Sequence, residues 1–239
     1  MFAGFTDDTV RFLMDLRFHN YTDFFHDQHA RYVRDVQTPF YELIEDLAPT
    51  MLSIDPMMEI RPWKCLSRIH RDTRFSKDKS PYRDHHWFLF RRAGEPREKS
   101  LFYFVEFGPE RLDWGMGLWG ENREVMDGFR KRIVANPDGI SAMIENMNLP
   151  GRKLGLGGTI FRRIDIPAGI PPKLERWYRS KEMYVGKVSP DYRLAFSERL
   201  MQEIRKDFTA LSPLYQLLRG ICDDQESFIV HQNDREREG

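Results

Sequence analysis

The sequence LFYFVEFGPERLDWGMGLW, residues 101–119, decides the fold of this chain. Residues 101–107 and 112–119 are rich in aromatic and aliphatic side chains, which favour β-strands. The four residues between them, Gly108-Pro109-Glu110-Arg111, have the composition of a tight turn. The stretch therefore predicts two neighbouring strands joined as a hairpin, and a hairpin joins strands in an antiparallel sheet.

Further strands are expected on both sides of this hairpin. Residues 63–69 and 86–92 have strand-like composition and flank a turn-rich segment, and residues 154–164 form a later candidate strand. Within the second strand of the hairpin, Gly115 and Gly117 predict a bulge or the close approach of another backbone, because glycine carries no side chain.

Helices are expected at both ends of the chain and after the hairpin, where apolar residues recur at helical spacing. These residues are Val10, Leu13 and Met14; Val33, Val36, Phe40, Leu43, Ile44 and Leu47; Val125, Met126, Phe129 and Ile133; and Leu200, Ile204, Phe208 and Leu211. Pro39 should kink or divide the second helix and Pro213 should break the last one, because proline lacks a backbone N–H. Asn136-Pro137-Asp138 has the order of a helix cap, a first-turn proline and a first-turn acid.

This order of elements predicts an α+β fold with a largely antiparallel central sheet and helices packed against it, not a doubly wound parallel sheet. A length of 239 residues fits a single domain, which we place at residues 1–222. Residues 223–239 are polar, and we predict a flexible C-terminal tail there.

Cofactor and metal chemistry finds little support in the sequence. Cys65 and Cys222 match no zinc spacing and suggest no disulfide framework, and no metal site is expected. Gly155-Leu-Gly-Gly158 lacks the spacing of a dinucleotide site, so the cofactor stays undetermined.

The first residues lack the order of a signal peptide, and no apolar run is long enough to span a bilayer. We therefore expect a cytoplasmic protein with no membrane partner, and the oligomeric state stays open.

Charge is distributed unevenly in a chain whose formal net charge is zero. Residues 61–92 hold ten Lys or Arg against three acids, so this segment carries +7 and the remainder of the chain −7. A local basic field in a neutral protein predicts an anion-binding site, not the general positive coat of a nonspecific nucleic-acid binder.

The basic residues concentrate in RIHRDTRFSKDKSPYR, residues 68–83, which we call the basic loop. Guanidinium and ammonium groups bind phosphate and carboxylate through charge-assisted hydrogen bonds. The predicted ligand-binding residues are Arg68, Arg71, Arg74, Lys77, Lys79, Tyr82 and Arg83. The alternative is a structural network, in which Asp72, Asp78 and Asp84 pair with the cations near them.

The sequence thus predicts binding of a phosphate- or carboxylate-bearing small ligand by the basic loop, with Tyr82 or Trp114 as the candidate stacking residue. One alternative is an enzyme acting on a phosphorylated substrate, with His70 and Asp72 as an acid–base pair or Glu106 in proton transfer. A second alternative is a nucleic-acid-binding protein, which the zero net charge disfavours. Whether the chain catalyses a reaction stays open.

Several segments resemble the uncharacterised DUF2461 family, also called the TIGR02453 family, and RDTRFSKDKSPY at residues 71–82 is the most specific of them. The others are Phe2-x-Gly-Phe5 with Phe12-Leu13, Asn20-Tyr-Thr-Asp-Phe-Phe25, His29-x-x-Tyr32, Gly115-Met-Gly-Leu-Trp119 and Ser212-Pro-Leu214. The resemblance covers the chain up to an extension that begins at about Asp223. It implies one intact domain distinguished by the basic loop, and it transfers no activity, cofactor or catalytic residue set.

Overall fold

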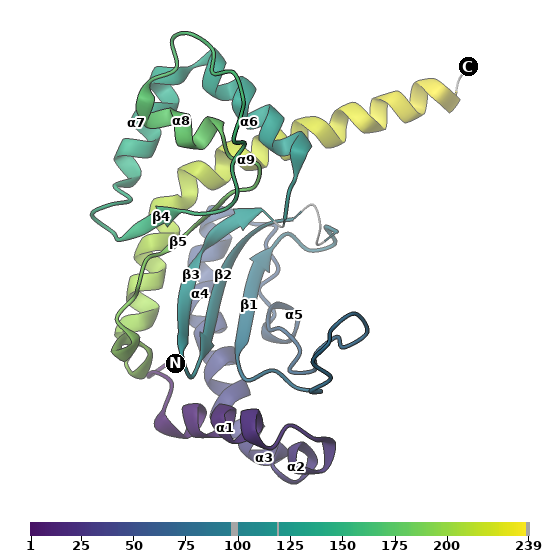
Figure 1. Cartoon of the computed structure of the whole chain (residues 1–239), viewed down its shortest axis with the longest axis vertical. Coiled ribbons are helices and arrows are strands. Elements are labelled where there is room, and N and C mark those ends of the chain that lie inside the picture. The colour runs from purple at the N-terminus through teal and green to yellow at the C-terminus, as the bar shows by residue number, and fades with distance from the viewer. Residues whose placement is uncertain (97–99, 119, 238–239) are drawn as a thin grey trace. The chain divides into compact units, whose positions relative to one another are not determined.

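The computed structural model describes residues 1–96, 100–118 and 120–237, with side chains as far as residue 224. Five strands form one antiparallel sheet in the order β1-β2-β3-β5-β4, and helices precede, separate and follow them (Figure 1). The predicted α+β fold with a largely antiparallel sheet is therefore confirmed. The strands are β1 (His86–Arg91), β2 (Leu101–Gly108), β3 (Arg111–Leu118), β4 (Leu154–Leu156) and β5 (Tyr184–Lys187).

All the helices named here lie before β1 or after β3 in the chain. They are α1 (Asp7–Phe18), α2 (Thr22–Asp27), α3 (His29–Arg31), the π-helical η1 (Tyr32–Gln37), α4 (Thr38–Ile54), α5 (Pro62–Cys65), α6 (Arg123–Ala135), α7 (Pro137–Met147), α8 (Pro172–Tyr178), the 3-10 helix η3 (Tyr192–Phe196) and α9 (Arg199–Arg237).

The chain divides into two compact units. Unit 1 comprises Met1–Gly94, Phe102–Gly115 and Lys187–Thr209, and unit 2 comprises Glu95–Leu101, Met116–Gly186 and Ala210–Gly239. α9 is helical as far as Arg237, so the backbone is regular through most of the segment for which we predicted a flexible tail. The domain limits 1–222 and 223–239 stay predictions.

The core of unit 1 lies between the N-terminal helices and one face of the sheet. Figure 1 shows α4 behind β2 and β3, and Phe40 of this helix packs edge-on against Phe88 of β1 with ring centroids 6.3 Å apart. Phe5 stacks on Phe107 of β2 at 4.1 Å. In the register of β1 with β2, His86 lies opposite Phe107 and Phe88 opposite Val105, and all four side chains are buried. Their alternation with half-exposed neighbours is the period-two pattern of a sheet with one covered face.

The predicted disturbance at Pro39 takes the form of a π-helical turn. η1 separates α3 from α4 and ends just before Pro39. Proline has no N–H to donate to the carbonyl of Asp35, four residues earlier. That oxygen instead accepts a hydrogen bond from Oγ1 of the buried Thr9, at 2.6 Å. A side chain of α1 thus donates to a carbonyl to which residue 39, as a proline, cannot donate.

Three local predictions were wrong. Residues 63–69 are not a strand, because Pro62 starts the short helix α5, and only isolated bridges such as Leu66 to Phe88 follow it. Pro213 does not end the last helix, which continues through it with the fully buried Leu211 and Leu214 on either side. The strand predicted at residues 154–164 is too long, because β4 comprises only three residues.

Unit 2 contains α6, α7 and α8 and the strands β4 and β5. Asn136 caps α7 by accepting the Gly139 N–H at 2.9 Å, with Pro137 in the first turn, as the sequence predicted. The predicted close approach is also present at Gly117, where a Cβ would lie 2.6 Å from Tyr184 Cβ and 2.8 Å from the Met183 carbonyl oxygen. The missing side chain lets β3 and β5 pair, since Leu118 N–H donates to that carbonyl at 2.9 Å.

Candidate functional site

The base of the basic loop is a short antiparallel ladder. Arg71 N–H donates to Pro81 O at 2.8 Å and Arg83 N–H to Ile69 O at 2.9 Å. Asn20, which lies between α1 and α2, closes the ladder from the side: its Nδ2 donates to Tyr82 O and its Oδ1 accepts from Tyr82 N, both at 2.9 Å. The amide of Asn20 is matched to both backbone groups of one residue, so the ends of the loop are held in place.

Neither candidate stacking residue is accessible. Tyr82 is 2% exposed and stacks on Phe25 of α2 with ring centroids 4.3 Å apart. Trp114 is fully buried in β3, and its indole N–H donates to Asp207 Oδ2 at 2.9 Å. Both rings therefore belong to the packing of unit 1.

Four of the six predicted cationic ligands hold the loop together. Arg71 pairs with Asp78, and Arg74 forks onto Asp72 through Nε at 3.0 Å and Nη2 at 2.7 Å. The other contacts are Lys79 Nζ to Thr73 O at 2.8 Å, and Arg83 Nη1 to Arg68 O at 2.9 Å and to His70 O. This local pairing is what the structural-network alternative expects of these cations.

The network leaves an excess of positive charge on the loop. Residues 68–83 hold six cations and only two carboxylates, Asp72 and Asp78, a net charge of +4. A side-chain hydrogen bond from Arg74 lowers the pKa of Asp72 to about 2, and one from Ser80 lowers the pKa of Asp78 to about 2. Both acids are therefore ionised at neutral pH, and the net charge of +4 already includes their two negative charges. Arg68 and Lys77 are exposed.

The side chains of the predicted acid–base pair, His70 and Asp72, contact different partners. The carboxylate of Asp72 is turned onto Arg74, whereas the ring of His70 lies 5.0 Å from Tyr82 and 6.0 Å from Phe25. Within the described residues no hydrogen bond joins His70 to Asp72. Residues two apart on an extended chain, such as His70 and Asp72, share a face. The ion pair between Asp72 and Arg74, however, determines the direction of the Asp72 carboxylate.

Glu106, by contrast, lies in an ionic chain on the sheet face opposite the core. Its Oε1 is 3.0 Å from Arg111 Nη1 and 3.5 Å from His85 Nε2. The other ring nitrogen of His85, Nδ1, is 2.9 Å from Asp84 Oδ1, and Arg17 Nε binds the second oxygen of Asp84 at 2.6 Å. Sequence reasoning named Asp84 only as a partner of the basic loop and connected none of Arg17, Asp84, His85 and Arg111 with Glu106, because only the tertiary structure brings them together.

Two further residues shape this chain of charges. A Cβ at Gly108 would lie 2.6 Å from His85 Cβ, so the absence of a side chain there gives the imidazole its place against β2. Asp113 lies across the two-residue turn of the hairpin from Glu106 and accepts the Trp114 N–H at 2.8 Å. Burial, with a smaller contribution from the charge of Glu106, raises the pKa of Asp113 to about 6.

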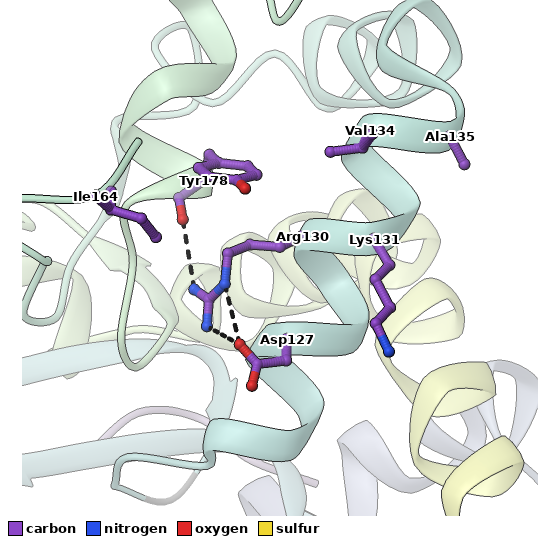
Figure 2. A pocket seen from close by; sticks show the side chains of 7 residues that line it. All are labelled: Asp127, Arg130, Lys131, Val134, Ala135, Ile164 and Tyr178. Atoms are coloured by element: carbon purple, nitrogen blue, oxygen red, sulfur yellow. Dashed lines mark hydrogen bonds and ion pairs between the residues drawn. The ribbon is translucent and has the colours of Figure 1, made fainter. Parts of the chain in front are cut away.

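Unit 2 has a depression of about 580 Å³ beside α6 (Figure 2). Asp127, Arg130, Lys131, Val134, Ala135, Ile164 and Tyr178 line it. In Figure 2 the guanidinium of Arg130 is turned onto Asp127, 2.7 Å away, and toward Tyr178 O at 3.4 Å; it also donates to Ser180 O at 2.8 Å. None of the predicted site residues lines this depression, and its buried cation is already neutralised.

Within the described residues, no group of three or more His, Cys, Asp or Glu side chains is placed to hold a metal ion. None of the helices that the structure describes is both long enough and apolar enough to cross a membrane. No curated protein and no solved structure matches the chain. The family model described as "Conserved hypothetical protein (DUF2461)" matches residues 8–217, which is most of the chain, and the chain therefore belongs to the DUF2461 family.

Proposed function

We propose that this protein binds a phosphate- or carboxylate-bearing small ligand through the basic loop. The observation that carries the proposal is the net charge of +4 on a loop whose base is held by a backbone ladder and by Asn20. A firm base lowers the entropy lost when a ligand orders the loop. Clustered arginines and lysines supply the donors that such anions need.

The ion pairs within the loop are compatible with this function. Arg74 and Asp72 are both exposed, and exposed ion pairs contribute only about 0–1 kcal/mol. A phosphate, which carries more charge than a carboxylate, can therefore compete for Arg74 at little cost. Arg68 and Lys77 are exposed cations that take part in neither of the carboxylate pairs within the loop, so a ligand can bind them without breaking those pairs.

The test is a thermal-shift titration at low salt with pyrophosphate as the probe. The wild type should be stabilised, because a ligand that binds only the folded state raises its stability by mass action. The double variant Arg68→Gln/Lys77→Gln should lose most of this shift. A matched control, Lys131→Gln/Arg199→Gln, removes two exposed cations outside the loop and should keep it. An equal shift in all three proteins would contradict the proposal.

The surroundings of His85 favour a second candidate function, proton transfer on a phosphorylated substrate. Each nitrogen of its ring faces a carboxylate, Asp84 at 2.9 Å and Glu106 at 3.5 Å. A carboxylate on one ring nitrogen fixes the tautomer and orientation with which the other exchanges a proton. Incubation with a panel of phosphorylated metabolites, followed by phosphorus NMR, tests for turnover. Turnover that persists in both His85→Gln and Glu106→Gln would remove these residues from the mechanism.

A further inference from the structure

The tip of the basic loop exposes a phenylalanine. Phe75 is 93% exposed, although its side chain is among those that folding usually buries. A turn closed by Ser76 N–H donating to Thr73 O at 3.3 Å places Arg74 and Phe75 at its corner. Because this turn stands on the ladder at the base of the loop, the ring is displayed at the tip by ordered backbone, not left there by a loose chain end.

The surroundings of this ring are cationic. The guanidinium carbon of Arg74 lies 5.7 Å from its centroid, and Lys79 Nζ binds the carbonyl of Thr73 in the same turn. Lys77, two residues further on, is exposed. An exposed cation–π contact contributes about 0.5–1 kcal/mol, which does not offset leaving a phenyl ring in water. The arrangement therefore contributes little to folding and leaves the ring accessible to an external partner.

An accessible aromatic ring bordered by cations is the combination that binds single-stranded nucleic acid, where bases stack on the ring and phosphates contact the cations. Tyr82 and Trp114 cannot do this, because both are buried. We propose that Phe75 is a stacking platform for a nucleobase and that the cations of the basic loop bind the flanking phosphates, so that the partner is a short single strand of nucleic acid. This inference rests on the proposed anion binding and extends it from one small anion to a strand that carries several phosphates.

Energies favour a strand over a free nucleotide. Stacking of one base contributes about 1–3 kcal/mol. Millimolar affinity already requires about 4 kcal/mol, so one base and one phosphate on an open surface bind weakly. A strand adds further phosphates, and each one contacted releases counterions. A flat anionic bilayer is disfavoured, since it would also face the ionised Asp72 and Asp78, whereas a flexible strand can place its phosphates on the cations alone.

The test is fluorescence anisotropy at low salt, with a short labelled oligothymidylate as the probe. Phe75→Ala should weaken binding roughly tenfold, the loss expected for one stacked base. Phe75→Trp should retain binding. The matched control is Phe18→Ala, which removes an equally apolar ring that is 73% exposed at the end of α1 and should leave the affinity unchanged. A strand of the same length with abasic sites should bind the wild type as weakly as the normal strand binds Phe75→Ala.

Three outcomes would overturn the inference: equal affinity of Phe75→Ala and wild type, equal affinity of abasic and normal strands, or binding only to anionic lipid vesicles that requires Phe75. Each can be separated from failure of anion binding itself. If pyrophosphate still stabilises the wild type and not Arg68→Gln/Lys77→Gln, the anion site stands and only the nucleic-acid partner is wrong. If pyrophosphate gives no shift either, both proposals fall.

Discussion

Thr9 donates its hydroxyl hydrogen to the backbone carbonyl of Asp35 at 2.6 Å, four residues before Pro39, which has no N–H to donate to it. Both groups are buried, so the bond replaces water that neither can reach. The contact ties α1 to η1 at the point where the helix changes its hydrogen-bonding pattern.

Thr9→Val should therefore lower the free energy of unfolding by about 1–3 kcal/mol, because in nearly the same volume it removes the donor to the buried Asp35 carbonyl and the acceptor of the Thr6 N–H. Urea denaturation followed by circular dichroism measures this loss. Thr9→Ser keeps the hydroxyl and should recover most of the stability relative to Thr9→Val. Equal stability of Thr9→Val and wild type would mean that the carbonyl finds another donor.

Asp207 is 2% exposed in α9 and accepts from two buried groups of unit 1, Trp114 Nε1 and Lys187 Nζ, both at 2.9 Å. Asp207→Ala leaves the ammonium of Lys187, itself 9% exposed, without this carboxylate. We expect a loss of about 3–5 kcal/mol, the range for breaking one half of a buried pair. Glu203→Ala, which breaks the exposed pair with Lys206 on the same helix, should change stability by about 0.5 kcal/mol or less. Comparable losses in both variants would contradict the burial argument.

The raised pKa of Asp113 predicts that this carboxyl group destabilises the fold as the pH rises. Burial raises its pKa from the ordinary 3.8 to about 6, so the folded state prefers the protonated form. The ionised form costs stability above about pH 6, and this cost disappears as the pH falls below about 4. Asp113→Asn, which can still accept from Trp114 N–H, should therefore stabilise the fold at pH 7.5 by about 1 kcal/mol after discounting for partial solvation.

The same substitution should have no stabilising effect at pH 4, where Asp113 is itself protonated in the folded state. Urea denaturation at both values measures the difference, and Asp165→Asn, at an exposed carboxylate, is the control. Stabilisation of equal size at both pH values would show that the effect does not come from ionisation.

Gly108→Ala tests how His85 is positioned. The new Cβ would lie 2.6 Å from His85 Cβ, closer than such atoms approach, so His85 or β2 has to shift, and we expect the shift to move the imidazole relative to Glu106. We expect a loss of about 1–3 kcal/mol in stability and a change in the NMR shifts of the His85 ring. Gly220→Ala, in an open position of α9, is the control and should stabilise by about 1 kcal/mol through helix propensity. An unchanged His85 signal would show that β2 gives way instead.

The sequence predicted the sheet better than the site, for physical reasons. The 101–118 hairpin depends on local signals, since its turn and its alternating strands are close in the chain. The placement of His85 beside Glu106 depends on strand register, a long-range property that composition does not reveal. The position of Phe75 within the basic loop was visible, but its exposure follows from the turn that only the structure shows. The prediction that Pro213 breaks the last helix was wrong because the burial of its leucine neighbours outweighs one lost hydrogen bond.

Substitutions in the basic loop should change ligand binding much more than they change the stability of the fold. Arg71→Gln/Arg74→Gln removes both carboxylate-paired arginines of the loop, and exposed pairs of this kind contribute about 0–1 kcal/mol each. The melting temperature should therefore change by only a few degrees, while the stabilisation by pyrophosphate is largely lost. The backbone ladder and the Asn20 clamp, which do not involve these side chains, should keep the base of the loop formed. If the double variant instead unfolds, the arginines serve the fold, and the charge of the loop is structural.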